Sequence, residues 1–421
     1  MPSPGNGGAS NGGSTFDASS VVDDAASNPG TPSSDASGTP AVPGKIGTLK
    51  FTRKTLHMLN LAEGIAFGDY NKDGHVDVLS GPYWWEGPAF DTKHQLFPPP
   101  PSNVYTGMTL GDWADYAYDV DGDGWVDSIN IMRPGTPSYW YKNPGMPAVQ
   151  TDVNWAKKEI GTLSWEQYAF ADMAGKGVPG VVGESNGALG WFDPDPAVSP
   201  WPFHTIAMAD NYTWNHGVGT GYIQGGSVRD FLNRDGWWSP PAAGPTSGPW
   251  TMHPQSFKGA GANGGSQMFG YDVDGDGQTD VISALNAHGY GVAWFQQKNG
   301  AFTEHDVVGG PGAMNAGGIP SFSQPHALLV ADIDGDGLQD IITGKSFYAH
   351  PPGLGDPDAA GTPVFYVFKL LRSAQGVIWE PHLVDSEVGL GRSLTATDLN
   401  GDGLVDIAVA CKHGVFLFFQ Q

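Results

Sequence analysis

The chain has 421 residues, of which 62 are Gly and 34 are Pro, and both residue types interrupt helices, so a mainly helical fold is not expected. Asp and Glu outnumber Lys and Arg by 44 to 20, and the formal net charge of -24 makes nucleic acid and anionic membranes poor partners. Hydrophobic residues make up 39% of the chain, which is enough for a packed core and excludes global disorder.

Residues 1–44 are predicted to be a flexible tether. They are almost entirely Gly, Ser, Ala, Pro, Asn, Thr, Asp and Val, and such a segment cannot bury enough apolar surface to offset its ordering entropy. A spacer of this kind commonly follows an export signal, so we expect an extracellular or cell-envelope protein of bacterial type, although no signal is visible. Membrane insertion is not expected, because no apolar run approaches the ~18 residues of a span. We expect a monomer.

One acidic motif recurs along residues 45–421. It has Asp or Asn at positions 1, 3, 5 and 9 and Gly at position 6, and it is intact in five copies. These positions are Asp69, Asn71, Asp73 and Asp77; Asp119, Asp121, Asp123 and Asp127; Asp272, Asp274, Asp276 and Asp280; Asp332, Asp334, Asp336 and Asp340; and Asp398, Asn400, Asp402 and Asp406. Two eroded copies begin at Asp172 and Tyr222, so the repeat starts follow one another at intervals of 50 to 66 residues.

Each copy of the motif lies between short strand patterns. An apolar strand precedes the loop, a β-branched strand follows it, an aromatic strand such as Tyr83–Trp85 comes next, and a fourth strand usually ends the unit. Four strands in each of seven repeats predict an all-β fold, a seven-bladed β-propeller at 45–421. The last unit lacks its outer strand, and residues 48–57 are expected to supply it and close the ring.

The acidic loops are predicted to bind up to five Ca²⁺ ions. Carboxylate and amide oxygens at these spacings, around a turn that Gly permits, form the ligand set that Ca²⁺ prefers. An EF-hand is excluded because it would place Glu at position 12 and helices on either side. The ions could serve calcium sensing or could staple the strand hairpins, and stapling is favoured because the loops are dispersed around the ring.

The repeats resemble the FG-GAP or VCBS-type calcium-binding propellers of bacterial exported proteins, and the resemblance covers residues 45–421. Four further segments are similar to the propeller portion of the fungal aldos-2-ulose dehydratases. They are Ser80-Gly81-Pro82-Tyr83-Trp84-Trp85-Glu86-Gly87-Pro88, Asp235-Gly236-Trp237-Trp238, Ala287-His288-Gly289-Tyr290-Gly291 and Ser323-Gln324-Pro325-His326-Ala327. This second resemblance implies a carbon–oxygen lyase that acts on oxidised sugars.

The residue six positions before each loop start is expected at one end of the central channel, opposite the acidic loops. We call this end the channel mouth. The seven residues are Glu63, Trp113, Glu166, His216, Ser266, His326 and Arg392, and His288 and Tyr290 are expected at the same mouth from a neighbouring hairpin. Burying charged groups costs free energy unless they pair or bind something, so the sequence predicts a functional mouth.

The lyase reading assigns catalytic roles at the mouth for β-elimination of water or an alcohol from a keto-sugar or uronate. His216 or His326 would be the base, and Arg392 would hold the enolate. Glu166 or Tyr290 would protonate the leaving group.

Two alternatives remain open. His216, His326, His288 and Glu166 could instead bind a catalytic divalent ion such as Zn²⁺ or Mn²⁺. The rival function is a non-catalytic binding module of the lectin or adhesion type, and a cell-surface scaffold is a third possibility. In each case the expected partner is a carbohydrate, either a small molecule or a polysaccharide, or, for the adhesion type, a protein.

Overall fold

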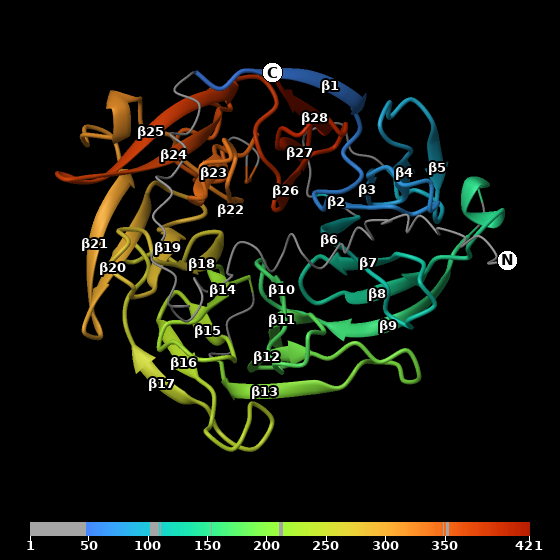
Figure 1. Cartoon of the computed structure of the whole chain (residues 1–421), viewed down its shortest axis with the longest axis horizontal. Helices are drawn as coiled ribbons and strands as arrows, with labels where there is room; N and C mark the ends of the chain where they lie inside the picture. Colours follow the sequence, from blue (N-terminus) through green and yellow to red (C-terminus); the bar gives the residue numbers. More distant parts are fainter. Residues whose placement is uncertain are drawn as a thin grey trace, which may run out of the picture.

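The computed structural model describes residues 48–421 except 102–108, 110, 153, 210–213, 348 and 351–352. The expected tether at 1–44 lies outside the described residues. Within them the chain is all-β, with two short 3₁₀ helices, η1 (Ala148–Gln150) and η2 (Ala316–Gly318). The sheets stand side by side around a central axis, which confirms a β-propeller arrangement (Figure 1).

Four sheets each contain four strands that are consecutive in the chain and antiparallel. They are β2 (Ala66–Gly68), β3 (Asp77–Ser80), β4 (Tyr83–Trp85) and β5 (Lys93–Gln95); β6 (Asp112–Tyr118), β7 (Asp127–Met132), β8 (Pro137–Lys142) and β9 (Ala156–Thr162); β10 (Ala169–Ala171), β11 (Gly180–Ser185), β12 (Ala188–Phe192) and β13 (Phe203–Met208); and β22 (Leu328–Ala331), β23 (Asp340–Gly344), β24 (Phe365–Ser373) and β25 (Gly376–Asp385).

A larger sheet has eight strands and consists of two such units joined along their innermost strands. The units are β14 (Val218–Gly221), β15 (Asp230–Asn233), β16 (Gly236–Ser239) and β17 (Thr251–Pro254), then β18 (Gln267–Tyr271), β19 (Asp280–Ala284), β20 (Val292–Lys298) and β21 (Ala301–Val308). β14 and β18 pair in parallel. Glycine permits this approach, because a Cβ at Gly219 would lie 1.8 Å from the carbonyl oxygen of Met268.

The remaining four-stranded sheet joins the two ends of the described chain. It contains β26 (Leu394–Thr397), β27 (Asp406–Cys411), β28 (Gly414–Gln420) and, as its outer strand, β1 (Phe51–His57). β1 pairs antiparallel with β28, with Phe51 opposite Gln420 and Arg53 opposite Phe418. The predicted closing strand is therefore confirmed, although it begins at residue 51 rather than 48.

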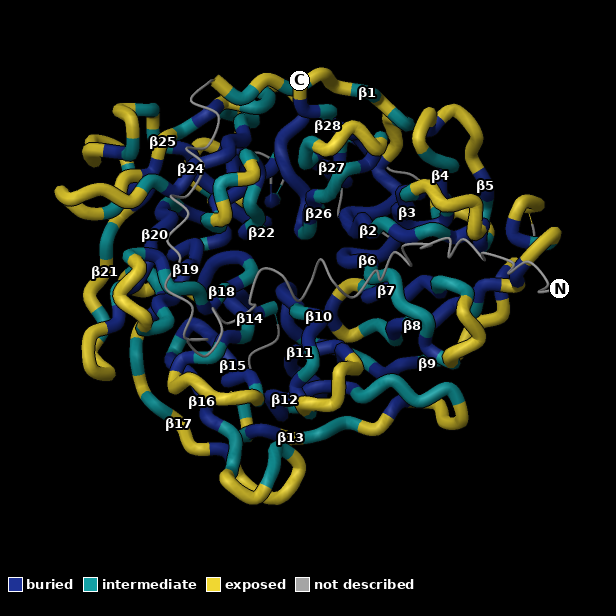
Figure 2. Tube along the Cα trace, viewed as in Figure 1, coloured by how far each residue is buried: buried dark blue, intermediate teal, exposed yellow. Residues whose placement is uncertain are grey.

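The innermost strands β2, β6, β10, β14, β18, β22 and β26 surround the axis, and most neighbouring members are in contact (Figure 1). Burial is deepest along the inner parts of the sheets, and the exposed residues lie mainly in the loops and outer strands (Figure 2). Each innermost strand leads from the channel mouth into one of the repeated loops, which is acidic in every repeat except the one that begins at Tyr222. The mouth and the loops therefore lie at opposite ends of these strands.

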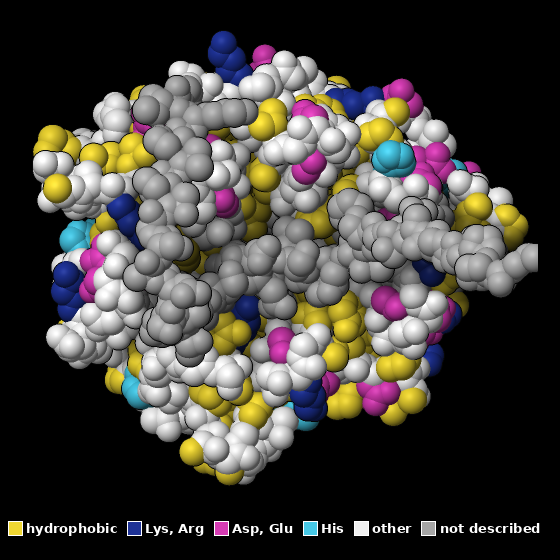
Figure 3. All heavy atoms as spheres, in the orientation of Figure 1, with side chains coloured by type: hydrophobic (Ala, Val, Ile, Leu, Met, Phe, Trp, Pro, Cys, Tyr) yellow, Lys and Arg dark blue, Asp and Glu magenta, His cyan; other side chains and the backbone are white. Residues whose placement is uncertain are grey.

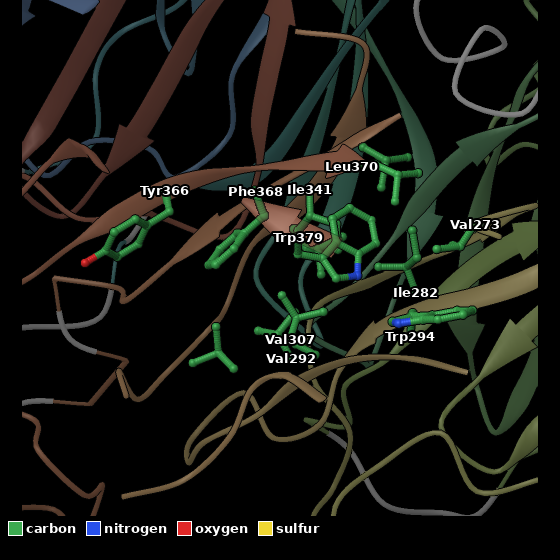
Figure 4. Close-up of a cluster of buried hydrophobic side chains, with 14 of the residues drawn as sticks. Val273, Ile282, Val292, Trp294, Val307, Ile341, Tyr366, Phe368, Leu370 and Trp379 are labelled. Carbon is green, nitrogen blue, oxygen red and sulfur yellow. The ribbon is translucent and has the colours of Figure 1, made fainter. Parts of the chain in front are cut away.

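Apolar side chains fill the wedges between neighbouring sheets. Between β18–β21 and β22–β25, Trp294 is 5% exposed and Trp379 is 6% exposed. Figure 4 shows these two indoles near Val273, Ile282 and Leu370. The aromatic strands that were predicted from the sequence are thus used for packing between sheets, where large rings bury the most surface.

Two carboxylates are buried together in β6. Asp112 is 1% exposed and Asp115 is 2% exposed, and Nδ2 of Asn130 donates to both, at 3.3 Å and 2.6 Å. Burial raises the pKa of Asp112 to about 7. Burial and the neighbouring charge of Asp112 raise the pKa of Asp115 well above its ordinary value. Near neutral pH the pair is therefore expected to retain a proton.

Removing the closing strand should destabilise the propeller. A chain that lacks residues 1–57 leaves β28 as an unpaired edge, so we expect a lower melting temperature and more aggregation than for the full chain. A chain that lacks only residues 1–44 is the matched control and should melt like the full chain. Equal melting temperatures for both truncations would show that the pairing of β1 with β28 contributes nothing.

The stability difference between Asp112→Asn and the wild type should depend on pH. A carboxyl group whose pKa is raised in the folded state stabilises the fold at low pH, and this contribution is lost as pH rises from about 4 through 7. The variant cannot ionise, so relative to the wild type it should be more stable at pH 8 than at pH 5. Chemical denaturation at both values measures this difference. Asp306→Asn at an exposed position is the control, and an equal difference at both pH values would contradict the assignment.

Candidate functional site

The acidic loops are turns closed by their own first carboxylate. Asp69 accepts hydrogen bonds from the backbone N–H of Asp73 at 3.1 Å and of Gly74 at 3.0 Å. Gly74 has a φ of 87°, which favours glycine. The same two bonds recur at Asp119, Asp272, Asp332 and Asp398, and the eroded loop keeps them at Asp172.

The ninth carboxylate of each intact loop ties the loop to the third strand of its sheet or to a residue just after that strand. Asp77 accepts the N–H of Tyr70 on Oδ2 and the N–H of Gly87 on Oδ1, both at 2.9 Å. Equivalent pairs of bonds form at Asp127, Asp280, Asp340 and Asp406. From the sequence, these aspartates were predicted only as ligands of an ion. In the structure they also accept hydrogen bonds from backbone N–H groups.

The five loops differ in the groups around their carboxylates. Three carboxylate oxygens lie within 4.8 Å of one another in the loops that begin at Asp119, Asp272 and Asp332. A lysine contacts the carboxylates in all three. Lys142 donates to Asp121 and to Asp123, Lys369 lies 2.5 Å from Asp334, and Lys298 lies 3.9 Å from Asp274. In these loops a calcium ion would compete with an ammonium group.

The seven residues predicted at the channel mouth are all buried, with at most 5% of each exposed. They are Glu63, Trp113, Glu166, His216, Ser266, His326 and Arg392. The structure joins six of them through contacts that centre on Arg392, and these contacts cross the axis between different sheets. Oγ of Ser266, the seventh, has no hydrogen-bond partner within the described part of the chain.

Arg392 is the centre of this cluster. Its Nη1 donates to Oε2 of Glu166 and, at 3.0 Å, to Nδ1 of His326. Its guanidinium carbon lies 3.6 Å from the centroid of the Trp113 ring, and its Nε is 3.8 Å from Oε2 of Glu63. One buried cation thus contacts residues from four repeats.

A second cation balances the buried charge. Nζ of Lys412 lies 3.5 Å from Oε1 of Glu63, which also accepts a 2.6 Å hydrogen bond from Thr109. Burial alone would raise the pKa of Glu63, but Lys412 and Arg392 together lower it. With Glu166, the cluster contains two carboxylates and two cations, so its net charge is zero when the nearby histidines are neutral.

Three histidine rings meet beside this ion-pair cluster. The centroids of His216, His288 and His326 are 4.7 to 5.2 Å apart, and one donor atom from each lies within 4.8 Å of the others and of a Glu166 oxygen. Burial lowers the pKa of both His216 and His326, so their rings are neutral near pH 7. Nδ1 of His216 and Nε2 of His326 are buried and lack a hydrogen-bond partner among the described residues, whereas Nε2 of His216 lies 3.4 Å from Oε2 of Glu166.

Asp356 orients the third histidine. Its carboxylate lies 3.2 Å from Nδ1 of His288 and 3.1 Å from Nδ1 of His350, and the two imidazoles stack at 4.4 Å. The sequence analysis missed Asp356, because it lies in the long connection between β23 and β24, outside the repeated positions. Only its place in the fold reveals its role.

Five of the six predicted catalytic residues come together, and Tyr290 does not join them. Tyr290 forms an isolated β-bridge with Ser323, and the described hydrogen bonds and ring contacts of the cluster do not include it. Glu166 is placed in the cluster, yet it does not suit the acid role. Burial alone would raise its pKa, but Arg392 and His216 hold the pKa well below the ordinary value, so the carboxylate stays ionised.

No helix among the described residues is long and apolar enough to cross a membrane. A family model described as an FG-GAP-like repeat matches residues 272–343, from the third intact loop into β23. The chain is also 31% identical over 163 residues to integrin alpha pat-2 of Caenorhabditis briggsae, which covers 35% of this chain and 13% of the integrin chain. The chain therefore combines FG-GAP-like repeats with a β-propeller arrangement and is locally similar to an integrin alpha chain.

Proposed function

We propose that this chain is an extracellular binding propeller, stabilised by calcium, that holds a ligand at the channel mouth. We count seven blades, taking the eight-stranded sheet as two. The FG-GAP-like repeats and the similarity to an integrin alpha chain favour a binding or adhesion module over an enzyme. One observation places the binding site at the mouth in this proposal. His216 and His326 each have a buried ring nitrogen that lacks a hydrogen-bond partner among the described residues. Each buried polar atom without a partner lowers the stability of the fold by about 1–3 kcal/mol, and a hydrogen bond or metal bond from a ligand would offset this loss.

A divalent ion such as Zn²⁺ or Mn²⁺ fits these donors. Glu166, His216, His288 and His326 offer one carboxylate and three imidazoles within 4.8 Å, and such sets suit Zn²⁺ with a position left open for a ligand oxygen. Asp356 supports the assignment, because a carboxylate on Nδ1 of His288 leaves Nε2 available, as in many zinc sites. A carbohydrate hydroxyl or carbonyl could then bind at the open position.

Arg392 opposes such an ion. Its guanidinium carries a positive charge and already occupies an oxygen of Glu166 and Nδ1 of His326. An ion that binds at the mouth must therefore displace these hydrogen bonds, while Glu63, 3.8 Å from Nε, remains a partner for the arginine.

The metal assignment predicts one Zn²⁺ site per chain at the mouth. Calorimetric titration of the calcium-loaded full chain with ZnCl₂ should show it, and His216→Ala should weaken binding at least tenfold. Arg392→Gln should bind Zn²⁺ more tightly than the wild type, because a competing cation is removed. His305→Ala, which changes a histidine on β21 outside the mouth, is the control. Equal affinity in the wild type and in His216→Ala would exclude the mouth as the metal site.

Calcium is proposed to stabilise the acidic loops. Burial raises the pKa of Asp77 and of Asp340 to about 8, so their ionised forms need a counter-charge, which a calcium ion supplies. Chelation with EDTA should lower the melting temperature by about 5 °C or more, and Ca²⁺ alone should restore it. Mg²⁺ is the control ion, because it seldom accepts such flexible all-protein ligand sets. An unchanged melting temperature after chelation would rule out a stabilising role.

A lyase that performs β-elimination on a keto-sugar or uronate is the second candidate. The specific observation in its favour is that two neutral histidines, which can accept a proton, lie beside Arg392, which can hold an enolate. The wild type and His216→Ala, His326→Ala variants can be assayed for an unsaturated carbonyl product. Turnover that is lost in variants that still bind the sugar supports the lyase, and no turnover by the wild type supports the binding module.

A further inference from the structure

A cavity of about 840 Å³ lies between the two halves of the eight-stranded sheet, at the end that carries the acidic loops. This size is within the range of ~300–1,000 Å³ that is typical of small-molecule sites. Its polar lining comes from Gln224, His253, Gln255, Gln278, Gln297 and Asn299. It is far from the channel mouth in the fold, since the mouth lies at the opposite end of the innermost strands.

The lining of this cavity is uncharged. Among the described residues that line it, none is Asp, Glu, Lys or Arg, although the chain contains 44 acidic and 20 basic residues. One reason for the lack of charge is the repeat that begins at Tyr222. The first position of its motif is an aromatic residue rather than an aspartate, and this residue lines the cavity. An ionic ligand or a metal would find no counter-charge here, whereas a neutral ligand would not be repelled.

The amides of the cavity are held in place before any ligand binds. Oε1 of Gln278 accepts the N–H of Asn299 at 2.7 Å, and Nε2 of Gln278 donates to Asp276 at 3.1 Å. Nε2 of Gln297 donates to the carbonyl of Thr279 at 2.7 Å. The second N–H of Gln297 donates to the carbonyl of Ile223 at 3.2 Å, so Gln297 can only accept from a ligand, through Oε1. Gln278 keeps one N–H to donate and a second lone pair on Oε1 to accept. Fixed amides also lose little conformational entropy when they bind, which favours affinity.

His253 adds a neutral imidazole and an aromatic surface. Its ring stacks on Trp237 with centroids 3.7 Å apart and an interplanar angle of 6°. Its Nε2 lies 3.2 Å from Nε2 of Gln224 and 3.0 Å from Oγ of Ser239. An amide nitrogen can only donate, so Nε2 of His253 accepts and Nδ1 carries the proton. The half-buried rings of Tyr222 and Phe302 complete the lining with apolar surface.

We propose that this cavity is a second binding site, separate from the channel mouth, for an uncharged polyhydroxylated ligand, that is, a neutral carbohydrate. Fixed amides that together donate and accept match sugar hydroxyls, and aromatic rings match the apolar C–H faces of a sugar. Because the lining is uncharged, the ligand expected here is neutral, whereas the ligands proposed for the mouth are charged uronates and metal ions.

Saturation-transfer NMR and calorimetry on the full chain, with calcium and without added zinc, test the proposal. The probes are maltose, cellobiose and lactose, with glucuronate as the charged comparison. At least one neutral disaccharide should bind, and more tightly than glucuronate. Gln255→Trp, which fills the cavity, should weaken this binding at least tenfold, and Gln224→Ala, at an exposed side chain, should weaken it severalfold. Gln375→Ala, in the exposed turn between β24 and β25, is the control and should bind like the wild type.

Three results would overturn the proposal. They are no saturation transfer to any of the three disaccharides, wild-type affinity in both Gln255→Trp and Gln224→Ala, or sugar binding that is lost in His216→Ala but kept in Gln255→Trp. The last result would show that the sugar binds at the mouth rather than in this cavity. Failure of the metal site at the mouth is a separate outcome, because it is measured with ZnCl₂ rather than with sugars.

Discussion

The hydrogen bonds that the first carboxylate of each acidic loop accepts are the interaction on which the rest of the propeller depends. They fix the turn at the end of an innermost strand, and the ninth carboxylate of the intact loops then ties that turn to the third strand of the same sheet or to a residue just after it. Because this geometry recurs in six repeats, and the repeat at Tyr222 keeps the same spacing, residues that stand six positions before each loop reach the same level around the axis. Even the eroded loop at Asp172 retains the first part of this arrangement.

This recurrence explains which parts of the molecule could be predicted from the sequence. The sheets, the closing strand and the convergence of Glu166, His216, His326 and Arg392 all follow from repeated positions, so spacing alone places them. Asp356 could not be found in this way, because it lies in a long connection that has no counterpart in other repeats.

Other features depend on contacts that spacing does not encode. The parallel pairing of β14 with β18 follows from a close backbone approach at Gly219, and the lysines that reach the acidic loops come from third strands whose side chains differ between repeats. Tyr290 lies only two residues from His288 in the sequence, yet it does not join the cluster. Closeness in sequence is therefore not enough to place a side chain at the mouth. The acidic side chains on the face shown in Figure 3 lie scattered among other types, so the net charge of -24 is not gathered into one patch there.

The pairing of β1 with β28 has a consequence for how the chain is made. Phe51 leaves the ribosome long before its partner Gln420, so the first strand waits without its neighbour until β28 has been made. Contacts between residues so distant in sequence form slowly, and an unpaired strand invites association with other nascent chains. Arg53 and Lys54 on β1 oppose such association because charged side chains discourage edge-to-edge pairing. The ring therefore cannot close until β28 has been made, and a chain that lacks β28 would carry every other sheet yet remain open.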